Sequence, residues 1–538
     1  MTLDGLLTFL GLMAAVYAII PAVARLRLRL QFGPQLVLGL IAFVLALYFE
    51  FFHLIGQPCP ENTRAICGWL EMPKDSSFTP QMAAFLVVLV WMVLAVAIAT
   101  YLPATQRSLR PIADLLEELF HRQRYGEAID FISPQLAFVE NAADRKLWRQ
   151  RVYDWLQTKR EFYLDDWLEG AVDARKTAVR PLRKVLSPFR AIFPSPDRAQ
   201  EEADRILNTL YLSSEFRRYL AVFRPRFAGR LLSSKTRQRF TFSDQFLSDL
   251  ISDRGSRLYE ELQRNATYDG PGDNLVVRHN FILQGYFSNA GIAESTQAWK
   301  PVGDFALSWI RDENHDILNR LNSKVEDFDV EKWVNPVAVA IVYFDLMVRS
   351  AVAQNVESDM WLGYLDHFVY ELVAGYDATG ANIDPDDEFP TLAARLIYES
   401  IDWLGHWIHL ARHAKPGSLH SRFSNSPHLD GAGIPSSAAR SLGTCLRYVL
   451  TSTKIGDTFA SYMLECVVRD IKSLAQATEK DARRYLIESI VSGGGYRHDC
   501  QYGKRLATLL HAVDYALRVD VEDFIAAAKE RYSDEDFP

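Results

Sequence analysis

Three long apolar runs near the start of the chain constrain its fold more than any other feature. They cover about 5–24, 34–53 and 82–102, and Glu50 is the only residue with a fixed charge in them. A helix needs about 20 apolar residues to cross a bilayer core, and a helix of a soluble protein is rarely apolar on every face. We therefore predict a membrane domain of three transmembrane helices over residues 1–103.

The first run is interpreted as a retained helix and not as a cleaved signal peptide. A signal peptide carries basic residues before its apolar core and small residues at a cleavage site. Here Asp4 is the only charge before the run, and the basic residues follow it. No small-residue cleavage site is evident either.

The distribution of basic residues predicts the orientation. They gather between the first two runs and just after the third, at Arg25, Arg27, Arg29, Arg107 and Arg110. The loop 56–79 holds only two basic residues, offset by three acidic ones. Basic loops stay on the cytoplasmic side. We expect a multi-pass protein of the cytoplasmic (inner) membrane, with its N-terminus outside and its large C-terminal part in the cytoplasm.

The five cysteines fit this orientation. Cys59 and Cys67 fall in the loop that would face the oxidising side, where such a pair is expected to form a disulfide. Two free thiols are the alternative. Cys445, Cys466 and Cys500 would lie in the reducing cytoplasm, and their spacing matches no metal-binding pattern.

The apolar runs lack the ionisable groups that mark ion pathways and proton relays. No Asp, Glu, Lys or Arg lies in the middle of any run. We therefore interpret the three helices as an anchor, which argues against a transporter or pump made from one chain. A pore built from several copies remains an alternative.

Charge is distributed unevenly along the chain. The net charge of −8 combines a neutral membrane domain, an excess of eight basic residues over 104–240 and an excess of sixteen acidic residues over 241–538. The basic excess is concentrated over 175–239. Its candidate lipid- or phosphate-binding residues are Arg180, Arg183, Lys184, Arg190, Arg224 and Arg226.

This basic segment has three interpretations. Cationic and apolar residues interleaved close to a membrane indicate contact with anionic lipid headgroups. Arginines beside Tyr219 and Phe223 would also suit phosphate contact and base stacking on a nucleic acid, a partner that we favour less. The third interpretation is structural, with long cationic side chains covering helices and pairing with the acidic distal region.

The periodicity after Pro111 is helical almost everywhere, so the fold class is all-α. Proline-rich and glycine-rich breaks divide it into a juxtamembrane helical region (104–187), a basic helical region (188–270) and an acidic distal domain (271–538). Helices are expected over 304–321, 336–354, 358–375, 391–413, 437–451, 457–477, 479–491, 502–518 and 521–531. Residues 414–435 form the longest irregular stretch.

A histidine cluster is the strongest candidate for chemistry. His406, His409 and His413 share one helix face, and the following loop contains His428 and Asp430. Histidines three or four residues apart on a helix can chelate a metal, with a loop providing a further ligand. The competing interpretation is a polar stripe, because Leu404, Trp407, Ile408 and Ala411 occupy the opposite face. No particular cofactor is indicated.

The second candidate is the segment Gly493–Cys500, whose three consecutive glycines could present backbone N–H groups to a phosphate. An interhelical turn is the alternative that we favour, since the segment matches neither a Walker A loop nor G-x-G-x-x-G. The chain also lacks a nucleophile elbow, a kinase loop and a zinc finger.

These features favour a membrane-anchored cytoplasmic helical module that acts as a sensor, scaffold or effector by binding a partner or ligand. A protein partner or a homo-oligomer is expected. Whether the chain is an enzyme is open, and a non-catalytic function is favoured. The alternatives are a membrane-tethered metal-dependent hydrolase using the His406–Asp430 region, and an oligomeric stress or defence effector that permeabilises the membrane.

Overall fold

The structure is a computed structural model, and it describes residues 32–51, 79–101, 106–157, 196–266, 279–312, 315–356, 362–380, 382–423, 433–474, 480–495 and 499–532. Within these ranges the regular structure is entirely helical, which confirms the all-α prediction. The chain divides into two compact units, Met1–Ser213 and Ser214–Pro538. The four-part division expected from the sequence remains a prediction.

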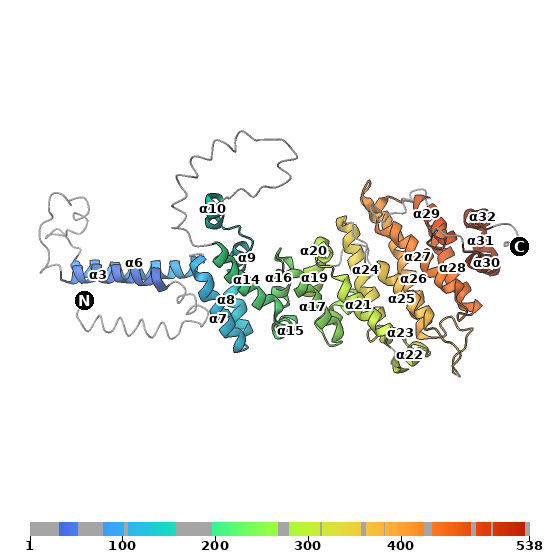
Figure 1. Cartoon of the computed structure of the whole chain (residues 1–538), viewed down its shortest axis with the longest axis horizontal. Helices are drawn as coiled ribbons and strands as arrows, with labels where there is room; N and C mark the ends of the chain where they lie inside the picture. Colours follow the sequence, from blue (N-terminus) through green and yellow to red (C-terminus); the bar gives the residue numbers. More distant parts are fainter. Residues whose placement is uncertain are drawn as a thin grey trace, which may run out of the picture. The chain divides into compact units, whose positions relative to one another are not determined.

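The first unit begins with a helical hairpin of α3 (Phe32–Glu50) and α6 (Pro80–Tyr101). Phe49, near the end of α3, packs on Ala83 and Ala84 at the start of α6. Gly39, towards the other end of α3, lies against the indole of Trp91. The two helices are therefore antiparallel (Figure 1). The N-terminus of α6 is capped by Thr79, whose hydroxyl accepts from the N–H of Met82 at 3.3 Å.

The predicted membrane segments are covered only in part. The run at 5–24, Cys59 and Cys67 lie outside the described residues, so the first span and the disulfide remain predictions. Among the described helices, α24 (Pro336–Gln354) alone is long and apolar enough to pass as a membrane span, and 89% of that stretch is buried within the protein. A helix buried on all sides forms a core, so α24 is a core helix of the protein.

The other described helices of the first unit form a small bundle of α7 (Leu109–His121), α8 (Tyr125–Ile132), α9 (Leu136–Ala143), α10 (Trp148–Gln157) and α14 (Pro196–Leu212). Helix α7 buries an apolar stripe that includes Ile112, Leu116 and Leu119. Its acidic face pairs with Arg205 of α14, which donates to Glu117 at 2.6 Å and to Asp114 at 3.0 Å. Residues 88 or more positions apart are thus brought together.

The second unit stacks its helices nearly in chain order (Figure 1). The pairs that pack together include α16 with α19, α17 with α21, α24 with α26, α25 with α27 and α27 with α29. Each helix thus contacts helices close to it in the sequence, as in helical-repeat proteins. The bounds are α15 Ser214–Phe223, α16 Pro225–Ser233, α17 Arg239–Ser252, α18 Arg257–Ala266, α19 Phe281–Phe287, α20 Ala290–Thr296, α21 Trp299–Ile310, α22 His315–Leu321, α23 Phe328–Glu331, α25 Leu362–Ala374, α26 Leu392–His409, α27 Ile434–Thr451, α28 Asp457–Ser473, α29 Lys480–Val491, α30 Cys500–Ala512, α31 Tyr515–Val519 and α32 Glu522–Arg531.

Local signals explain where α24 begins and ends. The Asn335 side chain accepts from the N–H groups of Val337 and Ala338, and Pro336 occupies the first turn. Both are strong signals for a helix N-terminus. Asn355 ends the helix in the left-handed conformation, with φ 57°. The observed bounds are those predicted from the sequence.

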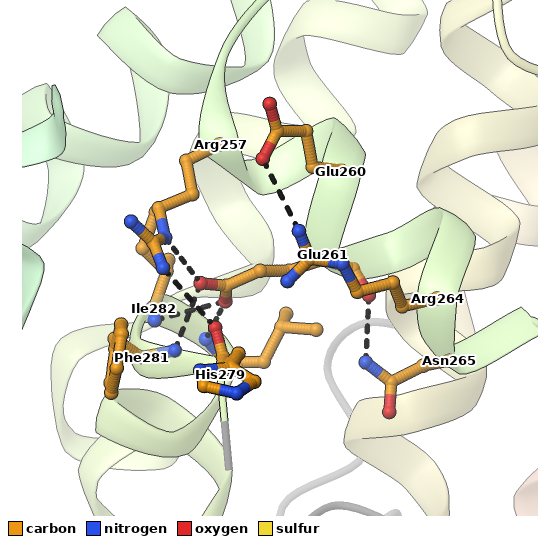
Figure 2. Close-up of polar contacts among 9 residues, drawn as sticks. Arg257, Glu260, Glu261, Arg264, Asn265, His279, Phe281 and Ile282 are labelled. Carbon is orange, nitrogen blue, oxygen red and sulfur yellow. Dashed lines mark hydrogen bonds and ion pairs between the residues drawn. The ribbon is translucent and has the colours of Figure 1, made fainter. Parts of the chain in front are cut away.

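A buried carboxylate fastens α18 to α19. Glu261 of α18 is fully buried and accepts from the backbone N–H groups of Phe281, Ile282 and Leu283 at 2.9–3.0 Å (Figure 2). Arg257 donates to the same carboxylate at 3.1 Å. The first N–H groups of a helix have no partner within the helix, so Glu261 satisfies the start of α19. Burial raises the pKa of Glu261, and the hydrogen bonds and Arg257 oppose that rise.

Candidate functional site

Two of the candidate histidines occupy the end of α26, and each ring has protein partners. The Nδ1 atom of His406 lies 2.9 Å from the carbonyl oxygen of Asp402. His409 lies between α26 and α28, with Nε2 2.9 Å from the hydroxyl of Ser473 and Nδ1 3.0 Å from the Arg412 guanidinium. His409 therefore makes a polar contact between two packed helices.

His413 follows in a short 3-10 helix (Leu410–His413) and is exposed. Within the described ranges, no three His, Cys, Asp or Glu side chains are grouped so that they could hold a metal. His428 and Asp430 lie outside these ranges, so the proposed ligand set cannot be assembled from the described histidines alone. The metal site remains a prediction.

A buried ion pair next to the histidines was not predicted as a site. Asp345 of α24 is buried and accepts from Arg349 at 3.0 Å and from the Trp407 indole N–H at 3.1 Å. Burial raises the pKa of Asp345, and Arg349 opposes that rise. Asp345 and Arg349 are four residues apart in an otherwise apolar helix, and this spacing is the sequence signal for the pair. The pair joins α24 to α26.

Only Arg224 and Arg226 of the basic candidates fall within the described ranges; Arg180, Arg183, Lys184 and Arg190 lie outside them. Both arginines are exposed near the start of α16. The Arg226 guanidinium stacks on the Phe281 ring, 4.6 Å from its centroid. At the preceding end of α15, Val222 and Phe223 are 64% and 67% exposed. Cationic and large apolar side chains are therefore exposed next to one another in the sequence.

The glycine segment after α29 is a helix C-cap. Gly493 and Gly494 have φ angles of 61° and 68°, and this left-handed region favours glycine. Their N–H groups donate to the carbonyl oxygens of Ile490 and Ser489 at 2.9 and 2.8 Å. Because α29 uses these N–H groups, they are not free to hold a phosphate. The interhelical turn is the interpretation that fits.

A cavity of about 560 Å³ lies beside this turn, lined by residues of α27, α29 and α32. Its charged and aromatic lining residues are Arg440, Tyr485, Glu488, Glu530 and Arg531. Ligand sites in proteins are concave, of this size and contain a few convergent polar groups. This cavity is therefore a candidate binding site. Sequence patterns pointed to the adjacent glycines but not to the cavity, because its lining residues come from three helices.

Comparison with known proteins adds no assignment. No protein-family model matches the chain, and neither a curated protein nor a solved structure does.

A half-buried carboxyl group, Asp366, lies near the cavity, in the contact between α25 and α27. Asp366 accepts hydrogen bonds from Ser441 and from the Cys445 thiol, whose sulfur lies 3.6 Å away. Burial raises the pKa of Asp366 to about 7, although both hydrogen bonds and Arg440 oppose the rise. In the unfolded chain an aspartate has a pKa near 3.9.

The folded protein therefore holds a proton at Asp366 that the unfolded chain has lost between about pH 4 and pH 7. Stability should decrease as the pH rises through this window. We expect Asp366→Asn to match the natural protein near pH 3.5 and to be more stable by about 1–3 kcal/mol at pH 8. Thermal unfolding across pH checks this, with exposed Asp481→Asn as the control. A stability difference that does not change with pH would contradict it.

Proposed function

We propose that the protein is an integral membrane protein whose C-terminal helical unit binds a ligand or partner in the cytoplasm, as a sensor, scaffold or effector. The observation that carries this proposal is the α3–α6 hairpin. Large apolar side chains are exposed along both of its helices. They include Leu36, Leu40, Val44, Phe85, Leu89 and Val93, which are between 42% and 68% exposed.

Such a surface is unfavourable in water. Burying apolar area stabilises by roughly 25 cal/mol per Å², and soluble proteins rarely expose a contiguous apolar patch beyond a few hundred Å². Neither α3 nor α6 has an acidic residue in its first turn or a basic residue in its last turn, where a soluble helix would usually carry them to balance its dipole. A bilayer would cover this surface. We extend the proposal to the three spans at 5–24, 34–53 and 82–102, and to the Cys59–Cys67 disulfide.

The proposed topology predicts opposite accessibility on the two sides of α6. In a chain that otherwise lacks cysteine, Leu70→Cys should react with a membrane-impermeant maleimide added to intact cells. Arg122→Cys, at the exposed residue that follows α7, should react only after the membrane is opened. The chain should also stay with the membrane in alkaline carbonate. Equal labelling of both positions would contradict the orientation, and release by carbonate would contradict the anchor.

We also propose that the end of α15 and the start of α16 contact anionic lipid headgroups. The exposed Val222 and Phe223 would enter the headgroup region while Arg224 and Arg226 meet the phosphates. Cationic residues near an anionic surface contribute about 1 kcal/mol each, and neighbouring apolar side chains add to the binding. The nucleic-acid interpretation of these arginines is less favoured, since Arg226 already stacks on Phe281.

This contact can be measured at Val222. An environment-sensitive dye on Val222→Cys should brighten and shift to the blue when the protein enters nanodiscs with anionic lipid, and much less with neutral lipid. Val330→Cys is the matched control, because Val330 is 67% exposed and lies between acidic neighbours in α23. Reversing Arg224 and Arg226 to glutamate should abolish the difference between the lipids. Equal spectra at the two positions would exclude the contact.

The other functions gain less support. Both ring nitrogens of His409 have protein partners, and no described geometry favours a hydrolase over a binding module. A membrane-permeabilising effector would need the same hairpin, but also an assembly of several copies.

A further inference from the structure

The cavity between α27, α29 and α32 has a charge pattern that selects a class of ligand. Two cations and two carboxylates line it, namely Arg440, Arg531, Glu488 and Glu530. We propose that it binds a small zwitterion of amino-acid or short-peptide type. This inference rests on the proposal that the C-terminal unit is a ligand-binding module, and it specifies the ligand.

Three of the four charged groups, Arg440, Glu488 and Glu530, are available to a ligand. Arg440 is only half-exposed, and within the described residues its guanidinium has no hydrogen bond or ion pair. The same holds for the carboxylates of Glu488 and Glu530. A cation withdrawn from water is costly without a partner, and a ligand carboxylate would provide one by bidentate hydrogen bonding.

The two carboxylates make a simple anion an unfavourable ligand for this cavity. A polyphosphate or a dicarboxylate would meet Arg440 but would be repelled by Glu488 and Glu530. A simple cation would meet the glutamates and be repelled by the arginines. A ligand with one positive and one negative charge is attracted by the two glutamates through the first and by the arginines through the second. The remaining lining includes Tyr485, Val491 and Ala527, which leaves apolar surface for a side chain.

The size of the cavity fits the same class. About 560 Å³ exceeds what a single small amino acid fills and falls within the range of small-molecule sites. The Tyr485 ring packs against Phe423 with centroids 5.9 Å apart, which supports the Tyr485 side of the cavity. The C-cap at Gly493 and Gly494 fixes the backbone at its edge. The site is therefore built on packed helices.

The test compares three charge forms of one dipeptide by calorimetry on the full chain in nanodiscs. L-alanyl-L-alanine carries both charges, its N-acetyl derivative only the carboxylate, and its amide only the ammonium. We expect the free dipeptide to bind at least about tenfold more tightly than either blocked form, as expected for the loss of a charged hydrogen-bond partner. Phosphoethanolamine, a zwitterion that also occurs as a lipid headgroup, is tested free and in vesicles to distinguish the two sources.

Two variants test which residues bind the carboxylate of the ligand and which bind its ammonium group. Arg440→Gln should weaken the free dipeptide about tenfold and leave the amide form unchanged, because the amide lacks the carboxylate that Arg440 would hold. Glu488→Gln combined with Glu530→Gln should remove the preference for the free over the N-acetyl form. Arg484→Gln, on an exposed part of α29 with Asp481 as its partner, is the control and should bind as the natural protein does.

The proposal is overturned if no zwitterion among the dipeptide, the common amino acids and phosphoethanolamine binds at about 10 mM. It is also overturned if Arg440→Gln weakens all three dipeptide forms equally. The membrane anchor is measured separately by carbonate extraction. A protein that remains anchored but binds no zwitterion refutes this inference and leaves the anchor intact.

Discussion

Replacing Glu261 by alanine should lower the free energy of unfolding of the C-terminal unit by about 3 kcal/mol or more. Glu261 is fully buried and accepts from three consecutive N–H groups at the start of α19. Alanine would leave these donors and Arg257 without their acceptor, and each unsatisfied buried group costs about 1–3 kcal/mol. The side chain also leaves a cavity.

Urea unfolding followed by circular dichroism measures this effect. Glu260→Ala is the matched control, since Glu260 is the next residue of α18 but its side chain is exposed and pairs with Arg264 at 3.6 Å (Figure 2). It should stay within about 0.5 kcal/mol of the natural protein. Glu261→Gln should fall between the two, because the amide oxygen can still accept. Equal effects at Glu260 and Glu261 would refute the capping role.

Replacing Gly443 by alanine should be similarly damaging, for a steric reason. A Cβ atom at Gly443 would lie 2.3 Å from the carbonyl oxygen of Ser489 and 2.9 Å from the backbone nitrogen of Gly494. Both atoms belong to the backbone, so no side-chain rotation relieves the overlap. Helix α27 must move away from α29, at a cost of about 3 kcal/mol, and the cavity beside them should deform.

Gly363→Ala in α25 is the control, because a Cβ there meets nothing within 4 Å. Alanine favours a helix over glycine by up to about 1 kcal/mol, so this variant should be neutral or slightly more stable. The pair separates steric overlap from helix propensity. If Gly443→Ala is as stable as Gly363→Ala, the close contact between α27 and α29 is wrong.

Elements with strong local signals could be predicted from the sequence. The bounds of α24 follow from Asn335, Pro336 and the apolar run between them, all of which act within a few residues. Breaks between helices that lack such local signals could not be predicted from the sequence. The helix expected over 304–321 is interrupted after Ile310, and the one expected over 502–518 ends at Ala512 before α31 begins. Neither break has a proline or glycine at it.

Even less of the candidate site could be predicted from the sequence. His406 and His409 lie on the predicted helix, yet the partners of His409, Ser473 and Asp470, come from another helix more than 60 residues away. The cavity combines Arg440 with Glu530, and no pattern of spacing connects them. Charge and periodicity report on one helix at a time, whereas a site depends on how several helices pack.

The chain-order stacking of the second unit has a consequence for biosynthesis. Contacts between helices that are near in sequence have a small loop-closure cost and form quickly. The apolar hairpin leaves the ribosome before α15 to α32, so the proposed membrane anchor would hold the nascent chain while these helices are still being made. Each helix can then dock on helices made shortly before it. A chain arranged in this way exposes little unfinished apolar surface at any moment of its synthesis.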